Sequence, residues 1–439
     1  RRVHRRLAGE RSVRLSVPFL GVLLLLSCNG ARDDGIERVV MWGLGREGQV
    51  VAELMPEFHR RYPKIRVSVQ QIPWTAAHEK LLTAHVGEAT PDVAQLGNTW
   101  IPEFVTIRAL ENLTPFVKQS EAITPEDFFE GIWATNTIGD DVYGVPWYVD
   151  TRLLFYRTDI LASVGFSRPP ETWDQWTEAM RRIGESGESH RFPILLPTNE
   201  WAQPVLLALQ QNATLLTEDG SHGAFRSPEF RRAFEFYISL FRDGHAPALS
   251  NAQVANVYQQ FEAGDFAMYI TGPWNIGEFR RRLGPSMEGK WSTAPMPAPP
   301  GESYPGTSLA GGASLVMFSR SERKEAAWKL IEYLSEPAQQ IRFYELTGSL
   351  PANEDAWNAP ALAGDPLAAA FRLQLENVSP TPKVAEWERI ATAVWETAES
   401  VIRGGQTIDA ALERLDATAD RILEKRRWVV QRKVERGDG

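Results

Sequence analysis

The sequence predicts an α/β protein organised in two units. Its 439 residues exceed what one compact domain usually holds and suit two units. Near the N-terminus, segments with strand and helix patterns alternate, which is typical of a largely parallel sheet covered by helices. A second alternating region follows from about residue 148.

Three strands and two helices are expected in the first unit. The strand segments are apolar or alternate, whereas the apolar residues of the helices recur every three to four positions. Strands are expected at residues 39–42, 65–69 and 91–96, and helices at residues 50–58 and 76–86.

The second unit shows helix signals around a loop-rich middle. Residues 172–175 form a capping box that opens a helix running to residue 183. Residues 285–308 are rich in Pro, Gly and Ser and predict a long loop or set of turns. Farther along the chain, and without assignment to either unit at this stage, helices are expected over residues 322–348 and, as a pair separated at residues 404–405, over residues 383–425.

The amino-acid composition narrows the classes of function that this protein can have. The net charge of -9 disfavours a nucleic-acid partner, because a phosphate backbone requires a basic surface. The 15 Trp residues mostly suit protein cores, but so many also suggest rings on which sugars stack. Cys28 is the single cysteine of the sequence, so no intrachain disulfide and no cysteine cluster can form. No metal and no cofactor are expected.

The N-terminal segment has the pattern of a secretory signal. Six Arg and one Glu lie within residues 1–14, and an apolar run follows at residues 17–26. The run is shorter than the roughly 20 apolar residues that span a bilayer. It ends in Leu-Leu-Ser-Cys, which resembles a bacterial lipoprotein box. Residues 1–27 are therefore expected to be a signal peptide, Cys28 to carry lipid, and residues 28–35 to be a linker.

Enzyme motifs are weak in this chain. Gly43, Gly45 and Gly48 match a dinucleotide-binding pattern, but the next strand ends in Gln70 and Gln71, where an acidic residue should hold the ribose. Such glycines still allow a ligand to approach a helix N-terminus. No nucleophile elbow, zinc-protease helix or Walker sequence is found. A carboxylate pair for glycoside hydrolysis stays open, because such pairs form in space.

Four blocks carry a resemblance to a known family. They lie at residues 91–100, at 144–157, at 261–268 with 271–274, and at 310–315 with 324–328 and 348–351. In order and spacing they resemble the extracellular solute-binding proteins of family 1, which include maltose- and trehalose-binding receptors. The resemblance covers nearly all of the chain after the N-terminal segment.

The resemblance implies a two-lobed periplasmic-binding-protein fold of type II. Crossing hinge segments are expected near residues 147–151, 311–316 and 360–380. The first lobe would comprise residues 36–147 plus 317–360, and the second residues 151–310 plus 380–430.

The resemblance also implies a set of ligand contacts. Tyr148 and Asp150 match an aromatic and an acidic contact at the hinge, and a carboxylate can accept two sugar hydroxyls. Trp274 matches a stacking platform. The remaining expected contacts are Glu47 after the first strand, Asn199, Glu200 and Trp201 in a second-lobe loop, and, less strongly, Trp74 and Trp387.

Two positions depart from the family pattern. Several relatives have an acidic residue where this chain has Gly97, so Asn98 or Thr99 is expected to replace that contact. Some relatives have Trp where this chain has Ala313. Both departures leave the identity of the sugar open.

The expected function is that of a monomeric, lipid-anchored receptor at the cell envelope. It would bind a saccharide, catalyse nothing, and deliver the sugar to the permease subunits of an ABC importer. Three alternatives stay open: a receptor of the same fold for another solute such as glycerol phosphate, an exported glycoside hydrolase, and a sensor or adhesion lipoprotein.

Overall fold

The structure is a computed structural model that describes residues 35–186 and 192–436. Contacts divide the chain into residues 1–36 and residues 37–439. Both sheets described below belong to residues 37–439. The expected signal peptide and Cys28 lie outside the described residues. None of the described helices is both long and apolar enough to cross a membrane.

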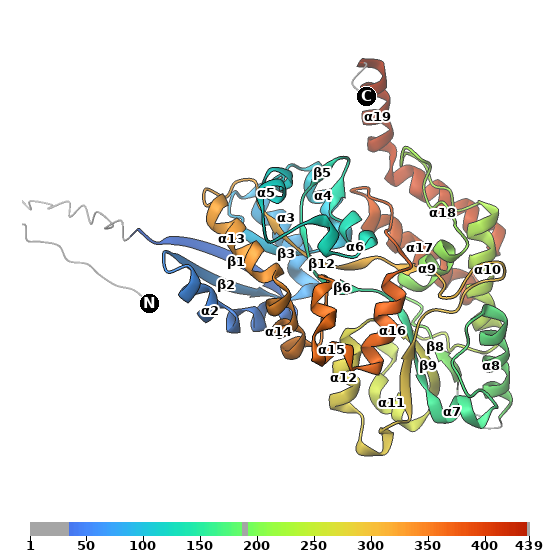
Figure 1. The fold of residues 1–439 in the computed structure, drawn as a ribbon. Helices are drawn as coiled ribbons and strands as arrows, with labels where there is room; N and C mark the ends of the chain where they lie inside the picture. Colours follow the sequence, from blue (N-terminus) through green and yellow to red (C-terminus); the bar gives the residue numbers. More distant parts are fainter. Residues whose placement is uncertain (1–34, 187–191, 437–439) are drawn as a thin grey trace, which may run out of the picture. The chain divides into compact units, whose positions relative to one another are not determined.

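The first sheet has six strands in the order β13-β6-β12-β3-β1-β2 (Figure 1). β1 runs parallel to both β2 and β3, whereas β12 pairs antiparallel with β3 and β6. The strands are β1 Glu37–Leu44, β2 Ile65–Ile72, β3 Val93–Gly97, β6 Val145–Asp150, β12 Gly311–Met317 and β13 Leu350–Pro351. The expected β-α-β-α-β order is therefore present.

Helices cover this sheet because each has an apolar face to bury. Leu81 of α3 packs with Leu44 and Phe104 in one buried cluster, whereas Phe58 of α2 packs with Ile331 of α13 in another. The helices around this sheet are α1 Gly45–Val50, α2 Met55–Arg61, α3 Trp74–Val86, α4 Ile101–Thr106, α5 Thr114–Gln119, α6 Glu130–Ala134, α13 Lys324–Ser335 and α14 Pro337–Thr347.

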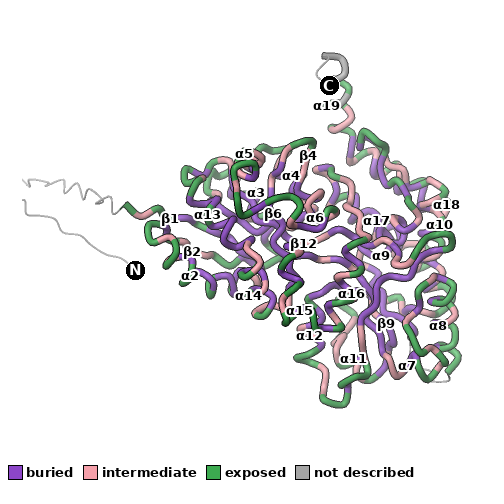
Figure 2. Tube along the Cα trace, in the orientation of Figure 1, coloured by how far each residue is buried: buried purple, intermediate pink, exposed green. Residues whose placement is uncertain are grey.

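The second sheet has four strands in the order β10-β7-β9-β8, with β8 parallel to β9. Its strands are β7 Leu153–Arg157, β8 Phe192–Leu195, β9 Phe266–Thr271 and β10 Trp291–Ala294. The helices that follow or surround it are α7 Thr158–Ser163, α8 Trp173–Glu185, α9 Ala202–Gln210, α10 Pro228–Arg242, α11 Val257–Ala263, α12 Trp274–Arg282, α15 Pro360–Ala363, α16 Pro366–Leu375, α17 Trp387–Ile402, α18 Ile408–Ile422 and α19 Glu424–Arg436. Two sheets, each flanked by helices, confirm the two-lobed α/β fold class. One buried cluster contains residues of both sheets, such as Met41 and Phe155, and another contains Leu154 and Met268 of the second sheet. Figure 2 shows buried residues along the strands in purple.

The chain passes between the two sheets at three places: after β6, before β12, and after β13, from which it continues to α15 and to α16 beside β10. β6 leads into β7 through Thr151 and Arg152. β11, Ser308–Leu309, leads into β12 and pairs with β14, Val378–Ser379, which lies between α16 and α17.

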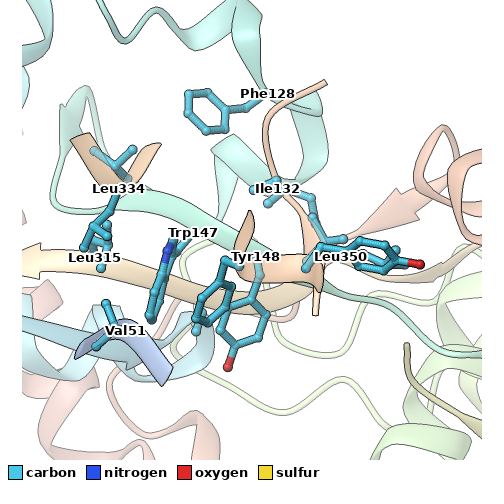
Figure 3. Close-up of a cluster of buried hydrophobic side chains, with 14 of the residues drawn as sticks. Val51, Phe128, Ile132, Trp147, Tyr148, Leu315, Leu334 and Leu350 are labelled. Carbon is cyan, nitrogen blue, oxygen red and sulfur yellow. The ribbon is translucent and has the colours of Figure 1, made fainter. Parts of the chain in front are cut away.

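Gly312 allows β12 to approach β6 closely. Its φ of +144° is unfavourable for residues with a side chain, and a Cβ there would lie 2.2 Å from the backbone oxygen of Tyr148. Trp147, the neighbour of Tyr148 on β6, is buried and stacks on Phe343 with 4.3 Å between ring centroids. Figure 3 shows Trp147 among Val51, Leu315 and Leu334, with Tyr148 beside it.

Two expectations about local structure were wrong. Residues 285–308 were expected to be a loop or a set of turns, but they contain strand β10, in which Trp291 to Ala294 pair with β7. The composition missed this strand because a short edge strand depends on a partner that is distant in the sequence. The capping box at residues 172–175 is incomplete. Thr172 accepts a hydrogen bond from the backbone of Gln175, but the Gln175 side chain accepts from the backbone of Glu171 instead of Thr172.

Candidate functional site

A cavity of about 540 Å³ is lined by residues from both sheets and from the segments that join them. Its volume lies in the range of small-molecule sites, roughly 300–1,000 Å³. Eight of the eleven residues expected to contact ligand line it: Glu47, Trp74, Asn98, Thr99, Tyr148, Asp150, Trp201 and Trp274.

Parallel strands explain why segments that follow different strands of the first sheet meet here. Because β1, β2 and β3 are parallel, their carboxyl ends lie at one edge of the sheet. Glu47 lies on α1 just after β1, Trp74 begins α3 after β2, and Thr99 follows β3. Each of these side chains therefore reaches the same cavity wall.

The second sheet contributes in the same way. β8 and β9 are parallel, and the segments after their carboxyl ends carry Trp201 and Trp274. Trp274 is 40% exposed and Trp74 is 37% exposed, so both rings offer apolar surface to a ligand. Four of the 15 Trp residues line the cavity, the fourth being Trp100.

A hydrogen-bond chain orients Tyr148. The backbone N–H of Leu44 donates to Oε1 of Gln95 at 2.7 Å, which leaves the Gln95 amide nitrogen to donate to the Tyr148 hydroxyl at 2.9 Å. The Tyr148 oxygen thus accepts a bond from the protein, and its own proton remains available to a ligand. Burial raises the pKa of Tyr148 well above its ordinary value, so the phenol stays protonated.

Glu47 is a half-buried carboxylate beside Trp74. Nε1 of Trp74 lies 3.5 Å from Oε2 of Glu47. Burial raises the pKa of the Glu47 carboxyl, and its own backbone N–H, Trp74 and Arg46 oppose that rise. Gly45 makes this packing possible, since a Cβ at that position would lie 2.6 Å from the Trp74 ring.

Asp150, at the end of β6, is paired with Arg152. Nη1 of Arg152 donates to Oδ1 of Asp150, and the guanidinium carbon lies 4.7 Å from the centroid of the Trp274 ring. Burial raises the pKa of Asp150, Arg152 lowers it, and the charge of Glu200 raises it further.

Three expected contacts do not line the cavity. Trp387 is fully buried and packs edge-on against Trp201 with 5.7 Å between ring centroids, so it supports a wall residue from behind. Asn199 accepts a hydrogen bond from the backbone of Asn251, and Glu200 accepts one from the Asn251 side chain. These three side chains are engaged in packing or loop structure and do not line this cavity.

The polar residues after β3 are already partnered. Nδ2 of Asn98 donates to Thr135, and Oδ1 of Asn98 accepts from Ser314. Thr99 donates to Glu388 of α17 at 2.5 Å. Both side chains line the cavity, and the Thr99 hydroxyl can still accept a hydrogen bond, so a ligand contact by either residue stays a prediction.

Several wall residues were not among the expected contacts. Trp100 packs against Trp74 with 5.7 Å between ring centroids, and its position directly after Thr99 could have indicated it. Arg46 and Arg152 were each adjacent or close to an expected contact, but the sequence does not reveal the direction of a long side chain. Glu278 on α12, Thr347, Ser349 and Thr381 also line the cavity.

The glycine motif has a packing role. Gly43 and Gly48 contact each other, and a Cβ on Gly48 would lie 2.3 Å from the backbone oxygen of Gly43. α1 is therefore pressed against the end of β1. Among the described residues there is no cluster of three or more His, Cys, Asp or Glu side chains able to hold a metal ion.

Comparisons with known proteins agree with this architecture. Residues 42–341 match the family of bacterial extracellular solute-binding proteins. The chain is similar to the sugar-binding protein MalE from the phytopathogen Xanthomonas citri, with a TM-score of 0.86 and 48% identity over 90% of this chain and 99% of that one.

Two further relatives are more distant. The diacetylchitobiose-binding protein DasA of Streptomyces coelicolor is 23% identical over 425 residues, which cover 92% of this chain and 96% of DasA. The GacH receptor of Streptomyces glaucescens shares the fold, with a TM-score of 0.76 and 21% identity over 89% of this chain and 99% of the receptor. The chain belongs to the bacterial extracellular solute-binding proteins, as its four sequence blocks predicted.

Proposed function

We propose that this protein is the saccharide-binding receptor of an ABC import system. The observation that carries the proposal is the cavity between the two sheets, where indole rings stand beside a phenol and three carboxylates. Sugar rings have apolar faces that stack on indole and polar rims that exchange hydrogen bonds with such groups. The similarity to sugar-binding relatives supports the same ligand class.

The charges of the wall favour a neutral solute. Arg46 and Arg152 face three carboxylates, those of Glu47, Asp150 and Glu278. Arg152 is already paired with Asp150, so its charge is compensated. The wall carries two cations and three carboxylates, and this excess of negative charge argues against glycerol phosphate as the ligand.

The mechanism that we propose is a hinged clamp. β6 and the segments at β11 and β14 connect the two sheets, and small rotations there would open and close the cavity. A ligand favours the closed form only if it binds that form more tightly. A sugar that contacts residues of both walls would do so, because the open form would offer it fewer contacts. The closed form would then dock on membrane permease subunits and release the sugar unchanged.

We also propose the boundaries of the two lobes and a lipid anchor. The first lobe would comprise residues 36–147 plus 317–360, and the second residues 151–310 plus 380–430. Family membership makes this an exported protein. Lipid on Cys28 would hold the protein at the cell envelope. We propose that it acts there as a monomer.

A thermal-shift screen tests the ligand class. The chain from residue 29 to residue 439 is heated with mono-, di- and oligosaccharides, and with glycerol phosphate as an anionic probe. A solute that binds the folded state raises the melting temperature by mass action. We expect a saturable rise with at least one neutral saccharide and none with glycerol phosphate. A rise with glycerol phosphate alone would overturn the saccharide assignment.

Glycoside hydrolysis is a second candidate, because Glu47 and Asp150 both line the cavity and both have raised pKa values. Hydrolysis needs one protonated and one ionised carboxyl on either side of the scissile bond. The Arg152 pair opposes a nucleophilic role for Asp150, since it occupies that carboxylate. Chromatography of the sugar after incubation distinguishes the two functions: an intact sugar supports the receptor, and cleavage supports the hydrolase.

A further inference from the structure

Asp150, Arg152 and Trp274 form a connected group where the hinge strand leaves the first sheet. Arg152 donates to Asp150 and lies over the Trp274 ring, and its side chain is 19% exposed. Among the described residues, Asp150 is the hydrogen-bond acceptor of the Arg152 side chain. A guanidinium has five N–H groups, so further donors remain at the cavity wall.

The Trp274 ring is held by contacts with two residues. A Cβ on Gly272 would lie 1.9 Å from a ring atom, so the indole is in contact with that part of the backbone. Arg152 lies over the ring with 4.7 Å to its centroid. A planar guanidinium stacks on an indole and bonds a carboxylate at the same time, which an ammonium group does less well.

The surroundings of Asp150 would favour its neutral form without Arg152. Burial and the charge of Glu200 both raise the Asp150 pKa, while Arg152 lowers it. Tyr148 experiences the charges of both Glu47 and Asp150. Arg46 and Glu278 complete the charged groups of the wall.

We propose that Arg152 is a positioning and specificity-determining residue of the saccharide site. It holds Asp150 as a charged acceptor, places donors beside that acceptor, and fixes the Trp274 ring. A carboxylate that only accepts, next to a guanidinium that only donates, suits neighbouring hydroxyl groups of a neutral sugar, since each hydroxyl does both. This inference rests on the proposed function of the cavity.

The test compares R152Q with R152K and with the parent chain, using maltose and trehalose as probes. Affinity is measured by titration calorimetry at several values between about pH 5 and pH 8. R181Q is the matched control, because Arg181 forms ion pairs on the exposed face of α8 and does not line the cavity.

We expect R152Q to bind the sugar roughly ten- to hundredfold more weakly at neutral pH, the size expected for losing hydrogen bonds to a charged group. Acidification protonates Asp150 and weakens binding. Because Arg152 lowers the Asp150 pKa, the pH at which binding is half lost should be higher in R152Q than in the parent. R152K should keep a midpoint near that of the parent, and R181Q should bind like the parent.

Two results would overturn the proposal. One is parent-like affinity of R152Q at every pH, and the other is weaker binding with an unchanged midpoint, which would assign Arg152 a purely structural role. Thermal unfolding checks that each variant folds. If R152Q does not fold, the affinity of R152K decides: we expect weaker binding than in the parent, because an ammonium group stacks on Trp274 less well, and parent-like affinity would overturn the proposal. If the parent binds neither these probes nor any saccharide of the screen, the proposed function fails as well. If the parent binds and R152Q behaves as the parent does, this inference alone fails.

Discussion

At the scale of single residues, the cavity places carboxylates where burial opposes their charge. Glu47 and Asp150 both have raised pKa values, and burial is the main cause for each. Such groups reduce the stability of the ligand-free protein at neutral pH, yet they are the strong acceptors that sugar hydroxyls require. As pH rises and these carboxyls ionise, sugar affinity should therefore increase while the stability of the ligand-free protein decreases.

Substitution of Glu47 by Gln tests this opposition. The raised pKa means that the folded protein takes up a proton on Glu47 more readily than the unfolded chain does. The resulting contribution to the free energy of unfolding is fully present below the unfolded pKa and is lost as pH rises through the folded pKa. We expect E47Q to melt at a higher temperature than the parent at neutral pH, with the difference shrinking on acidification.

The same variant should bind sugar roughly ten- to hundredfold more weakly at neutral pH, because an amide replaces a charged acceptor. Calorimetric melting and titration at several pH values measure both effects. E57Q is the control, since Glu57 is exposed on α2 and lies away from the cavity. A lower melting temperature of E47Q at neutral pH would contradict the account of Glu47.

Residues of the site could be predicted where strand ends determine their position. Glu47, Trp74 and Thr99 follow three parallel strands, so their convergence follows from the strand order. Trp387 could not be placed this way, because a helix residue is buried or exposed according to what packs on it. The direction of Arg152 depends on a ring and a carboxylate that only the folded chain brings together.

At the scale of elements, the hinge depends on the close pairing of β6 and β12. Gly311 lies opposite Asp150, and Gly312 lies opposite Val149. A Cβ on Gly311 would lie 2.5 Å from the backbone oxygen of Asp150. The two glycines thus bring β12 close to the strand that carries the cavity residues Tyr148 and Asp150.

Substitution of Gly312 by Ala should disturb this pairing. The positive φ of Gly312 opposes a side chain, and a Cβ there would lie 2.2 Å from the backbone oxygen of Tyr148. Gly404 is the matched control, because its φ of +74° is also positive while nothing lies within 4 Å of its Cβ position. We expect G404A to lose about 1 kcal/mol of stability and G312A to lose more, up to about 3 kcal/mol.

G312A should also weaken sugar binding, because Tyr148 and Asp150 would shift, whereas G404A should leave affinity unchanged. Denaturant unfolding and calorimetric titration measure the two quantities. Equal losses of stability in both variants would show that the close approach of β12 to β6 is unimportant.

Element prediction was accurate where signals are local and failed where they are not. The helix pair α17 and α18 separates near Gly404, as the glycines there predicted. β10 lay hidden in a loop-like composition because its four residues form a strand by pairing with β7, more than 130 positions earlier. Pro337 divides the predicted helix of residues 322–348 into α13 and α14, because its ring cannot continue the preceding helix.

At the scale of the whole molecule, function depends on combining two walls. The ends of β1, β2 and β3 supply Glu47, Trp74 and Thr99, and the segments after β8 and β9 supply Trp201 and Trp274. Neither wall alone encloses a ligand. A sugar that touches both walls would stabilise their closed arrangement by its differential affinity.

The fold class followed from length and alternating elements, and the family followed from four blocks of sequence. The sugar itself did not follow, because its identity depends on side-chain directions and on small differences such as Gly97 and Ala313. Ala313 is buried opposite Gly97 and does not line the cavity, so it offers no stacking surface.

Calorimetric titration with recovery of the ligand tests the central claim most directly. The chain is titrated with the best saccharide of the screen, and the sugar is afterwards released by unfolding and examined by mass spectrometry. The account predicts one intact sugar bound per chain, with affinity lost when Trp274 is replaced by Ala. A cleaved sugar, or binding that the loss of Trp274 leaves unchanged, would contradict it.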